Sequence, residues 1–151
     1  MNRLVDVYPY RSNRSQFEFL ILKRASDVIY AGQWRMIGGK VNSNETYHEA
    51  ARRELKEEIG GTSNLFWTIP SINQFYDHEN DQLHQIPAFA ARIATGQGII
   101  LNHEHQDYRW ISTDVIRDFI AWPEQRRLMQ LTHSIVTNNE ILEEWIINGS
   151  K

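Results

Sequence analysis

The segment from Gly38 to Gly61, GGKVNSNETYHEAARRELKEEIGG, constrains the fold more than any other stretch of the chain. Thr46, followed three residues later by Glu49, forms a capping box that satisfies free backbone N–H groups at a helix start. The residues after it are good helix formers, and Gly60–Gly61 supplies the left-handed conformation that commonly ends a helix. The segment therefore predicts a helix over about Tyr47 to Ile59.

Three glutamates share one edge of this predicted helix. At about 100° per residue, Glu57 lies about 60° to one side of Glu54 and Glu58 about 40° to the other. An apolar stripe recurs every four residues along the helix and consists of Tyr47, Ala51, Leu55 and Ile59. By angle, Glu58 points along this stripe rather than away from it.

Two interpretations of the acidic edge are open. In the first, the carboxylates are solubilising groups paired with nearby bases such as Arg53. However, like charges at this spacing cost roughly 0.2–0.5 kcal/mol per pair even in water, and more beside apolar surface. In the second, a divalent cation such as Mg²⁺ or Mn²⁺, which prefers hard oxygen ligands, relieves the repulsion. The spacing favours this metal site.

The rest of the chain alternates strand-like and helix-like stretches. Strands are predicted at Leu4–Tyr10, Phe17–Leu22, within Ile29–Ile37, and at Leu65–Thr68, Ser71–Tyr76, Gln85–Ala94, Gly98–Leu101 and Tyr108–Ile111. A helix is predicted from Pro123, a favoured first helical residue, and helical spacing recurs at Ile141, Leu142, Trp145 and Ile146. The Gly96–Gly98 stretch lacks the Lys-Ser/Thr of a phosphate loop and indicates a turn. These elements predict one α/β domain over residues 1–151.

Composition excludes several classes of protein. The balance of 16 Lys and Arg against 19 Asp and Glu, a net charge of −3, argues against broad binding of nucleic acid or an anionic membrane. The absence of cysteine excludes disulfide scaffolds, cysteine-based metal sites and thiol nucleophiles. The N-terminus has no signal-peptide-like apolar run, and no stretch is apolar for long enough to span a membrane. We expect a cytoplasmic monomer or homodimer that acts on a small molecule.

The spacing of the acidic segment carries a family resemblance. It reads Gly39, five residues, Glu45, seven residues, then Arg53-Glu-Leu-Lys-Glu-Glu-Ile-Gly-Gly61. This pattern resembles the signature of the Nudix hydrolases, G-x5-E-x7-R-E-U-x-E-E-x-G-U, in which U is aliphatic. Only Gly61 departs from it, and we expect this glycine to loosen the packing of the loop after the helix. The resemblance implies the family's α/β/α sandwich with a mixed central sheet.

The resemblance also implies a metal site. In this family Mg²⁺ or Mn²⁺ ions bridge the helix carboxylates and the pyrophosphate of the substrate. By position, Glu54, Glu57 and Glu58 would be the metal ligands, and the carbonyl of Gly38 would be a further one. Glu54 would also be the base that accepts the proton of the attacking water.

The remaining motif residues are implied to support this site. Arg53 would orient a glutamate by a charge-assisted hydrogen bond, with Glu45 as its partner. The motif glycines, Gly39 and Gly60, would let the backbone approach where a Cβ would obstruct it.

In many family members the base or an extra metal ligand comes from a glutamate outside the motif. Here Glu104, within the stretch Asn102–Trp110, lies in a loop that we expect to fold back over the helix. It would have a catalytic or metal-binding role, or be a plain exposed acid. His103 and His105 are expected to be surface groups or ligand contacts rather than a zinc site.

Substrate contacts are harder to assign from sequence. Arg24 and Arg35 are candidates for phosphate binding, although each could be a plain surface cation. Several aromatic side chains could stack on a base or belong to the core; these are Tyr30, Trp34, Phe75, Phe89 and Trp122. Trp34, beside Arg35, is included with the two arginines as a substrate-binding candidate.

The resemblance implies a pyrophosphohydrolase that acts on a nucleoside diphosphate linked to another group. A (deoxy)nucleoside triphosphate such as dATP, or a pterin triphosphate, is favoured, with monophosphate and pyrophosphate as products. ADP-ribose, sugar nucleotides and dinucleoside polyphosphates stay open as substrates. The alternatives are a Nudix-fold sensor that binds a nucleotide without turnover, and an enzyme that trims RNA 5′ ends, for which the charge is unfavourable.

Overall fold

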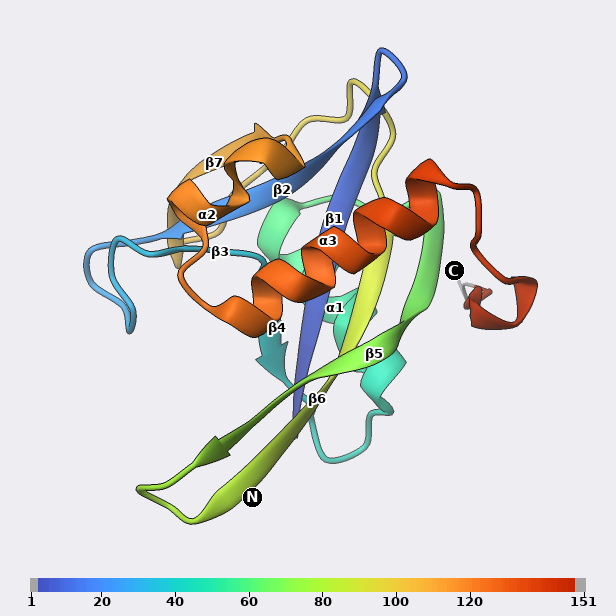
Figure 1. The fold of residues 1–151 in the computed structure, drawn as a ribbon. Helices are drawn as coiled ribbons and strands as arrows, with labels where there is room; N and C mark the ends of the chain where they lie inside the picture. Colours follow the sequence, from blue (N-terminus) through green and yellow to red (C-terminus); the bar gives the residue numbers. More distant parts are fainter. Residues whose placement is uncertain (1–2, 149–151) are drawn as a thin grey trace.

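The computed structural model describes residues 3–148. Figure 1 shows a twisted mixed β-sheet with helices α1 (Tyr47–Ile59) and α3 (Pro123–Thr137) on opposite faces. The strands are β1 (Leu4–Asn13), β2 (Gln16–Arg24), β3 (Trp34–Arg35), β4 (Ile37–Lys40), β5 (Leu65–Asp77), β6 (Gln82–Arg92) and β7 (His105–Ile111). Short helical turns are η1 (Thr113–Val115), α2 (Ile116–Phe119) and η2 (Glu143–Trp145).

The sheet has the strand order β3-β2-β1-β6-β5, with β4 paired to β1 and β7 paired to β2. β1 and β6 are parallel, and the other paired strands are antiparallel. Consecutive residues of a strand point to opposite faces. On β1, Val5 and Val7 therefore join the core under α1, whereas Tyr8 and Tyr10 join the core under α3. Because helices cover both faces of the sheet, the predicted α/β/α sandwich is confirmed. The bounds predicted for α1 are confirmed as well.

Two predictions about strands near the middle of the chain were inaccurate. Leu65–Thr68 and Ser71–Tyr76 belong to one strand, β5, whose pairing with β6 shifts register between Thr68 and Ile72. The interruption falls at Pro70, which has no backbone N–H for the ladder. The strand expected within Ile29–Ile37 is divided into β3 and β4, and Gly38 and Gly39 lie inside β4.

The strand predicted at Gly98–Leu101 was wrong, because these residues form an irregular segment. The N–H of Ile100 donates to the carbonyl of Ile59 at 2.9 Å. The side chain of Ile100 also lies against Gly60, where an added Cβ would be 2.9 Å from the Cβ of Ile100. The apolar residues of this segment thus cover the end of α1 instead of extending the sheet.

The helix suggested by the spacing of Ile141, Leu142, Trp145 and Ile146 was also wrong. Only the turn η2 forms, and Trp145 stacks on Trp67 with ring centroids 6.1 Å apart. Ile146 makes an isolated antiparallel bridge with Trp67, and the N–H of Ile147 donates to the carbonyl of Phe66 at 2.8 Å. This segment buries its apolar residues along the edge of β5, so a helix is not needed to bury them.

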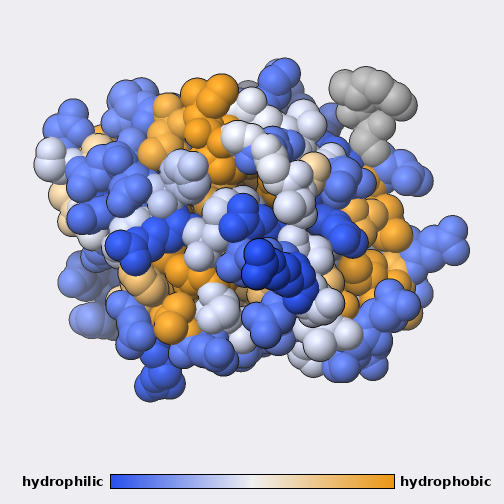
Figure 2. Space-filling model, turned by 90° about the horizontal axis from the view of Figure 1, so that it is seen from above, coloured by the Kyte–Doolittle hydropathy of each residue, from blue (hydrophilic) through white to orange (hydrophobic). Residues whose placement is uncertain are grey.

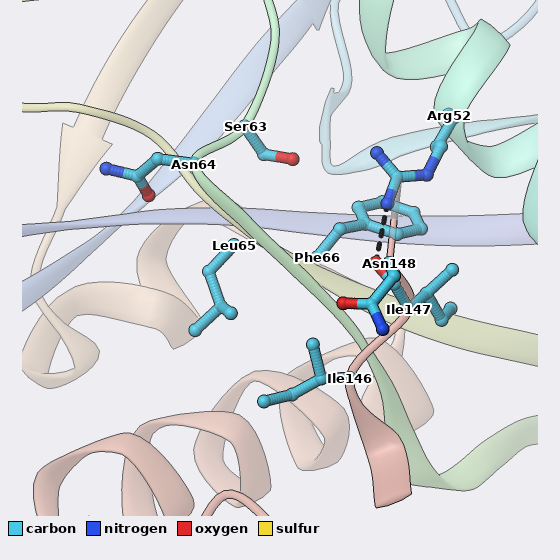
Figure 3. Close-up of a pocket in the computed structure, with 8 residues that line it drawn as sticks. All are labelled: Arg52, Ser63, Asn64, Leu65, Phe66, Ile146, Ile147 and Asn148. Atoms are coloured by element: carbon cyan, nitrogen blue, oxygen red, sulfur yellow. Dashed lines mark hydrogen bonds between the residues drawn. The ribbon is translucent and has the colours of Figure 1, made fainter. Parts of the chain in front are cut away.

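A cavity of about 200 Å³ lies where this C-terminal segment meets α1 and the start of β5 (Figure 3). Arg52 reaches into it from α1, with its guanidinium 4.6 Å from the ring centre of Phe66. Nη2 of Arg52 donates to the carbonyl of Ile147 at 2.7 Å. Arg52 lies about 160° around the helix from Glu54, so this cavity is separate from the acidic edge.

On the face that carries the β1–β2 turn, hydrophilic residues predominate and hydrophobic residues form separate patches (Figure 2). Large exposed hydrophobic side chains occur on several different elements, including Tyr76 and Leu83 of the protruding β5–β6 hairpin. None of the helices in residues 3–148 combines the length and the apolar character that crossing a membrane requires.

Candidate active site

Local interactions fix both ends of α1. The N–H of Glu49 donates to the hydroxyl of Thr46 at 3.3 Å, and the N–H of Thr46 donates to the carboxylate of Glu49 at 2.9 Å. This is the predicted capping box. Gly60 ends the helix with φ at 71° and donates its N–H to the carbonyl of Lys56. The acidic edge of α1 is thus presented by a helix whose limits are set by its own sequence.

Arg53 joins the motif residues at one end of this edge. Its Nε donates to Oε2 of Glu45 at 2.7 Å and its Nη2 to Oε1 at 2.9 Å, so the expected Arg53–Glu45 pair is present and bidentate. Nη2 also donates to the carbonyl of Lys40 at 2.8 Å. Nη1 donates to Glu54 at 2.9 Å and contacts Glu57 at 3.3 Å. Hydrogen bonding to Arg53 lowers the pKa of Glu45 to about 2.

Glu54 lies directly over Gly39. A Cβ at Gly39 would collide with the carboxylate of Glu54, which is why this position of β4 requires a glycine. The side chain of Glu54 is only 13% exposed. Burial raises the pKa of Glu54 to about 7; its hydrogen bond to Arg53 opposes the rise, and the charges of Glu58 and Glu57 add to it.

Glu58 is buried, in agreement with its predicted position along the apolar stripe. Its Oε2 lies 2.8 Å from Nδ1 of His105, which is also buried. The contact has no well-aligned hydrogen bond, and neither atom has another partner within residues 3–148. The expectation that His105 is a surface group was therefore wrong, because its imidazole is buried and packs against Glu58. Glu57, by contrast, is 53% exposed.

These residues fit a divalent cation, although they are not gathered around one point in this conformation. No three carboxylate or imidazole side chains of residues 3–148 lie close enough together to hold a metal ion. Two observations nevertheless fit one: the buried Oε2 of Glu58 has no well-aligned hydrogen bond, and burial, with a smaller contribution from the charges of Glu58 and Glu57, raises the pKa of Glu54. A cation bound by hard oxygen ligands would relieve both. Gly38, the further candidate ligand, is an exposed residue of β4.

The loop before β7 folds back over the end of α1, as expected. Nδ2 of Asn102 donates to the carbonyl of Glu57 at 3.3 Å, and Oδ1 of Asn102 accepts from the N–H of Glu104 at 3.0 Å. The carbonyl of Glu104 in turn accepts from the N–H of Ala25 at 2.8 Å. The backbone of Glu104 is therefore held near the acidic edge, whereas His103 is exposed.

The glycine that departs from the family signature has a specific neighbour. A Cβ at Gly61 would collide with the side-chain amide of Gln97. Gln97 thus occupies space that an aliphatic residue at position 61 would need. The loop after α1 is filled at this point, in contrast to the expected loosening.

The three substrate-binding candidates lie on or near β2 and β3. Nε of Arg24 donates to the carbonyl of Ile29 at 3.1 Å, and its Nη1 lies 3.5 Å from Nε2 of His105. The guanidinium of Arg35 lies 4.5 Å from the ring centre of Tyr30. Trp34 packs edge-to-face on Phe119. Arg24 is thus connected to the acidic edge through His105, while Trp34 packs with the core under α3.

A buried acid on the other face was missed at the sequence level. Asp6 is buried on β1, and burial raises its pKa to about 6. It accepts a hydrogen bond from Asn73, 67 residues away in the chain, at 2.9 Å. Its position within the apolar run Leu4–Tyr10 was a usable signal, because an acid between core residues is costly unless it has partners.

Comparison with known proteins agrees with this geometry. The sequence matches the NUDIX domain family over residues 2–132. It is 30% identical over 104 residues to the nucleoside triphosphatase NudI of Escherichia coli, covering 64% of this chain and 74% of that protein. The fold is similar to that of a putative NUDIX hydrolase from Listeria monocytogenes, with a TM-score of 0.77, 19% identity, and coverage of 91% and 96% of the two chains.

A third similar protein is the E. coli dihydroneopterin triphosphate pyrophosphohydrolase, with a TM-score of 0.71, 20% identity, and coverage of 87% and 94% of the two chains. At these identities the structural matches establish the fold, and the sequence matches together with the complete set of motif carboxylates establish the family. The chain therefore belongs to the Nudix hydrolase family.

Proposed function

We propose that this Nudix hydrolase cleaves a nucleoside or pterin triphosphate to the monophosphate and pyrophosphate, with Mg²⁺ or Mn²⁺ held by Glu54, Glu57 and Glu58. The observation that carries the proposal is the acidic edge itself. Glu58 presents a buried oxygen without a hydrogen bond, and Glu54 beside it has a pKa raised to about 7. The NudI and dihydroneopterin triphosphate enzymes, by their names, act on triphosphates, which supports this class of substrate.

In the proposed reaction, water attacks phosphorus, its oxygen forms the new P–O bond, and the anhydride P–O bond breaks with pyrophosphate as the leaving group. A bound divalent ion supplies Lewis-acid stabilisation of the charge that gathers on the phosphate oxygens. Oε2 of Glu54 is the oxygen that Arg53 does not hold, and it accepts the proton of the water.

The other residues of the motif hold this arrangement in place. Arg53, fixed by its bidentate pair with Glu45, orients Glu54 through Nη1. Gly39 leaves room for the carboxylate of Glu54 above β4. Glu104, whose backbone is tied to Ala25, is the alternative base if its side chain turns toward the acidic edge.

The test is a panel of nucleoside triphosphates, dihydroneopterin triphosphate, ADP-ribose, sugar nucleotides and a dinucleoside polyphosphate, assayed with Mg²⁺. Phosphate and pyrophosphate are scored separately. We expect pyrophosphate from triphosphates, and no activity in EDTA until Mg²⁺ or Mn²⁺ is added back. Faster cleavage of ADP-ribose or a sugar nucleotide would refute the proposed substrate class, and binding without turnover would favour a sensor.

Substitutions of Glu54 and Glu58 test whether these two residues take part in the reaction. Glu54→Gln and Glu58→Gln each remove one charge while keeping the shape of the side chain, and we expect kcat to fall by about 10²-fold or more. Glu140→Gln, at an exposed position after α3, is the matched control and should retain the wild-type rate. A wild-type rate in either site variant, with an unchanged circular dichroism spectrum, would refute that residue's role.

A further inference from the structure

A chain of buried polar groups lies on the face of the sheet opposite α1. Oδ2 of Asp6 accepts from the hydroxyl of Tyr8 at 3.2 Å and from Nδ2 of Asn73 at 2.9 Å. Nε1 of Trp122 donates to Oδ1 of Asn73 at 3.3 Å. Asp6 is 5% exposed and Asn73 is 2% exposed. The network fixes the Asp6 carboxylate in one orientation, because one of its two oxygens is held by two donors.

The second carboxylate oxygen of Asp6 is Oδ1, and both hydrogen bonds described above go to Oδ2 instead. Within residues 3–148 no group donates a hydrogen bond to Oδ1, yet this atom is not sealed in the interior. It lies beside Gly38, where an added Cβ would stand 3.6 Å from it, and Gly38 is exposed. A carboxylate that is almost wholly buried, with one oxygen free of donors beside an exposed glycine, is suited to accept a hydrogen bond from a ligand.

The oxygen Oδ1 of Asp6 and the acidic edge lie on either side of the same strand, β4. Gly38 and Gly39 are consecutive in β4, so the side-chain positions point to opposite faces of the sheet. A Cβ added at Gly39 would meet the side chain of Glu54, and a Cβ added at Gly38 would lie beside the side chain of Asp6. Among the described strands β4 pairs only with β1, so its other edge is open. A ligand that crosses this strand of two glycines meets Glu54 on one face and Asp6 on the other.

We infer that Asp6 binds an amino group on the heterocycle of the substrate, and so makes the enzyme prefer amino-bearing bases over their oxo counterparts. The inference rests on the proposed function, because it places the triphosphate at the acidic edge and the heterocycle beyond Gly38. An ionised carboxylate can only accept hydrogen bonds. It therefore binds the exocyclic N–H of cytosine, adenine, guanine or a pterin, and is mismatched with a carbonyl oxygen at the same ring position.

The surroundings of Asp6 suit a flat ring. Trp122 is tied to the network through Asn73, and 41% of its surface is exposed. Phe75 packs edge-to-face on Trp122, with ring centroids 5.0 Å apart. The exposed indole of Trp122, which is joined to Asp6 through Asn73, offers a surface on which a flat ring can stack.

The experiment compares triphosphates whose bases carry an amino group or an oxo group at the same ring position: CTP with UTP, ATP with ITP, and GTP with xanthosine triphosphate. The kcat/KM of each is measured for the wild type, for Asp6→Asn and for Asp114→Asn, an exposed acid that serves as control. In at least one pair we expect the wild type to prefer the amino-bearing member by about tenfold or more, since a hydrogen bond to a charged group is lost with the oxo member. In Asp6→Asn this ratio should fall below about threefold, because the Asn amide offers N–H donors as well as an acceptor. Asp114→Asn should retain the wild-type ratio.

Gly38→Ala gives a second test, independent of how well Asp6→Asn folds. Its methyl group would lie 3.6 Å from Oδ1 of Asp6 and should reduce the same preference by covering that oxygen. Wild-type ratios below about threefold in all pairs, or a preference that Asp6→Asn leaves unchanged, would overturn the inference while triphosphate cleavage stands. A wild-type protein that cleaves neither these triphosphates nor dihydroneopterin triphosphate would refute the proposed function, and the inference with it.

Discussion

Replacing Asp6 with Asn should change how the stability of the protein depends on pH. Burial raises the pKa of Asp6 from 3.8 to about 6, so the folded state holds this proton more tightly than the unfolded state does. The wild type is therefore most stable, relative to the variant, below the unfolded pKa. It loses this advantage as the pH rises through the folded pKa, because the buried carboxylate must then be charged.

The magnitude follows from the size of the shift. A rise from 3.8 to about 6 corresponds to about 3 kcal/mol between the two protonation states. Most of it falls within an accessible range: between pH 4.5 and 7.5 the difference in free energy of unfolding should change by about 2 kcal/mol in favour of Asp6→Asn. The Asn amide oxygen can still accept from Tyr8 and Asn73, so the variant should fold.

The assay is urea denaturation of both proteins at several pH values in EDTA, so that no metal binding contributes. Groups that titrate in both proteins contribute equally to the two free energies of unfolding, so they cancel in the difference. The free energy of unfolding of Asp114→Asn should differ from that of the wild type by the same amount at every pH. A difference between the wild type and Asp6→Asn that does not vary with pH would refute the argument, because it would mean that Asp6 titrates alike in the folded and unfolded chains.

Three further changes test other parts of the structure. Thr46→Ala removes the N-terminal cap of α1 and should lower the free energy of unfolding by about 1 kcal/mol, measured by urea denaturation; an unchanged midpoint would contradict the capping geometry. Gly39→Ala places a methyl group in the space of the Glu54 carboxylate. It should lower kcat for the best triphosphate by about 10-fold or more, because misplacement of a catalytic group is costly, and a wild-type kcat would show that Glu54 need not lie there. Trp145→Ala removes the indole stacked on Trp67 and should destabilise the fold by about 2–3 kcal/mol; a calorimetric melting temperature equal to that of the wild type would show that the C-terminal segment does not stabilise β5.

The sequence alone determined α1 and the direction of its acidic edge. The capping box, the helix formers and Gly60 all act within a few residues of one another, so their effect does not depend on the rest of the chain. The helical period then placed Glu58 along the apolar stripe before any tertiary contact was known. The Arg53–Glu45 pair, which the resemblance to the Nudix signature implied, is present in the structure.

Only the tertiary structure decided how the remaining apolar stretches are used. Gly98–Leu101 has the composition of a strand, and Ile141–Ile146 has the spacing of a helix. Each segment could bury its side chains in more than one way. In the fold, Gly98–Leu101 packs on the end of α1, and Ile141–Ile146 packs along the edge of β5. Propensity is a weak guide where packing offers an alternative partner.

The same reason explains the site residues that were not foreseen. His105 is buried because Glu58, 47 positions before it in the numbering, lies 2.8 Å away. Asp6 is buried because Asn73, 67 residues further along, donates to it. The apolar run around Asp6 signals that this acid is buried, but no local pattern names its partner, and His105 alone resembles a surface group. The sequence therefore determined the acidic edge, which one helix carries, whereas the environment of the buried His105 and Asp6 was decided by strands and loops that meet only in the folded protein.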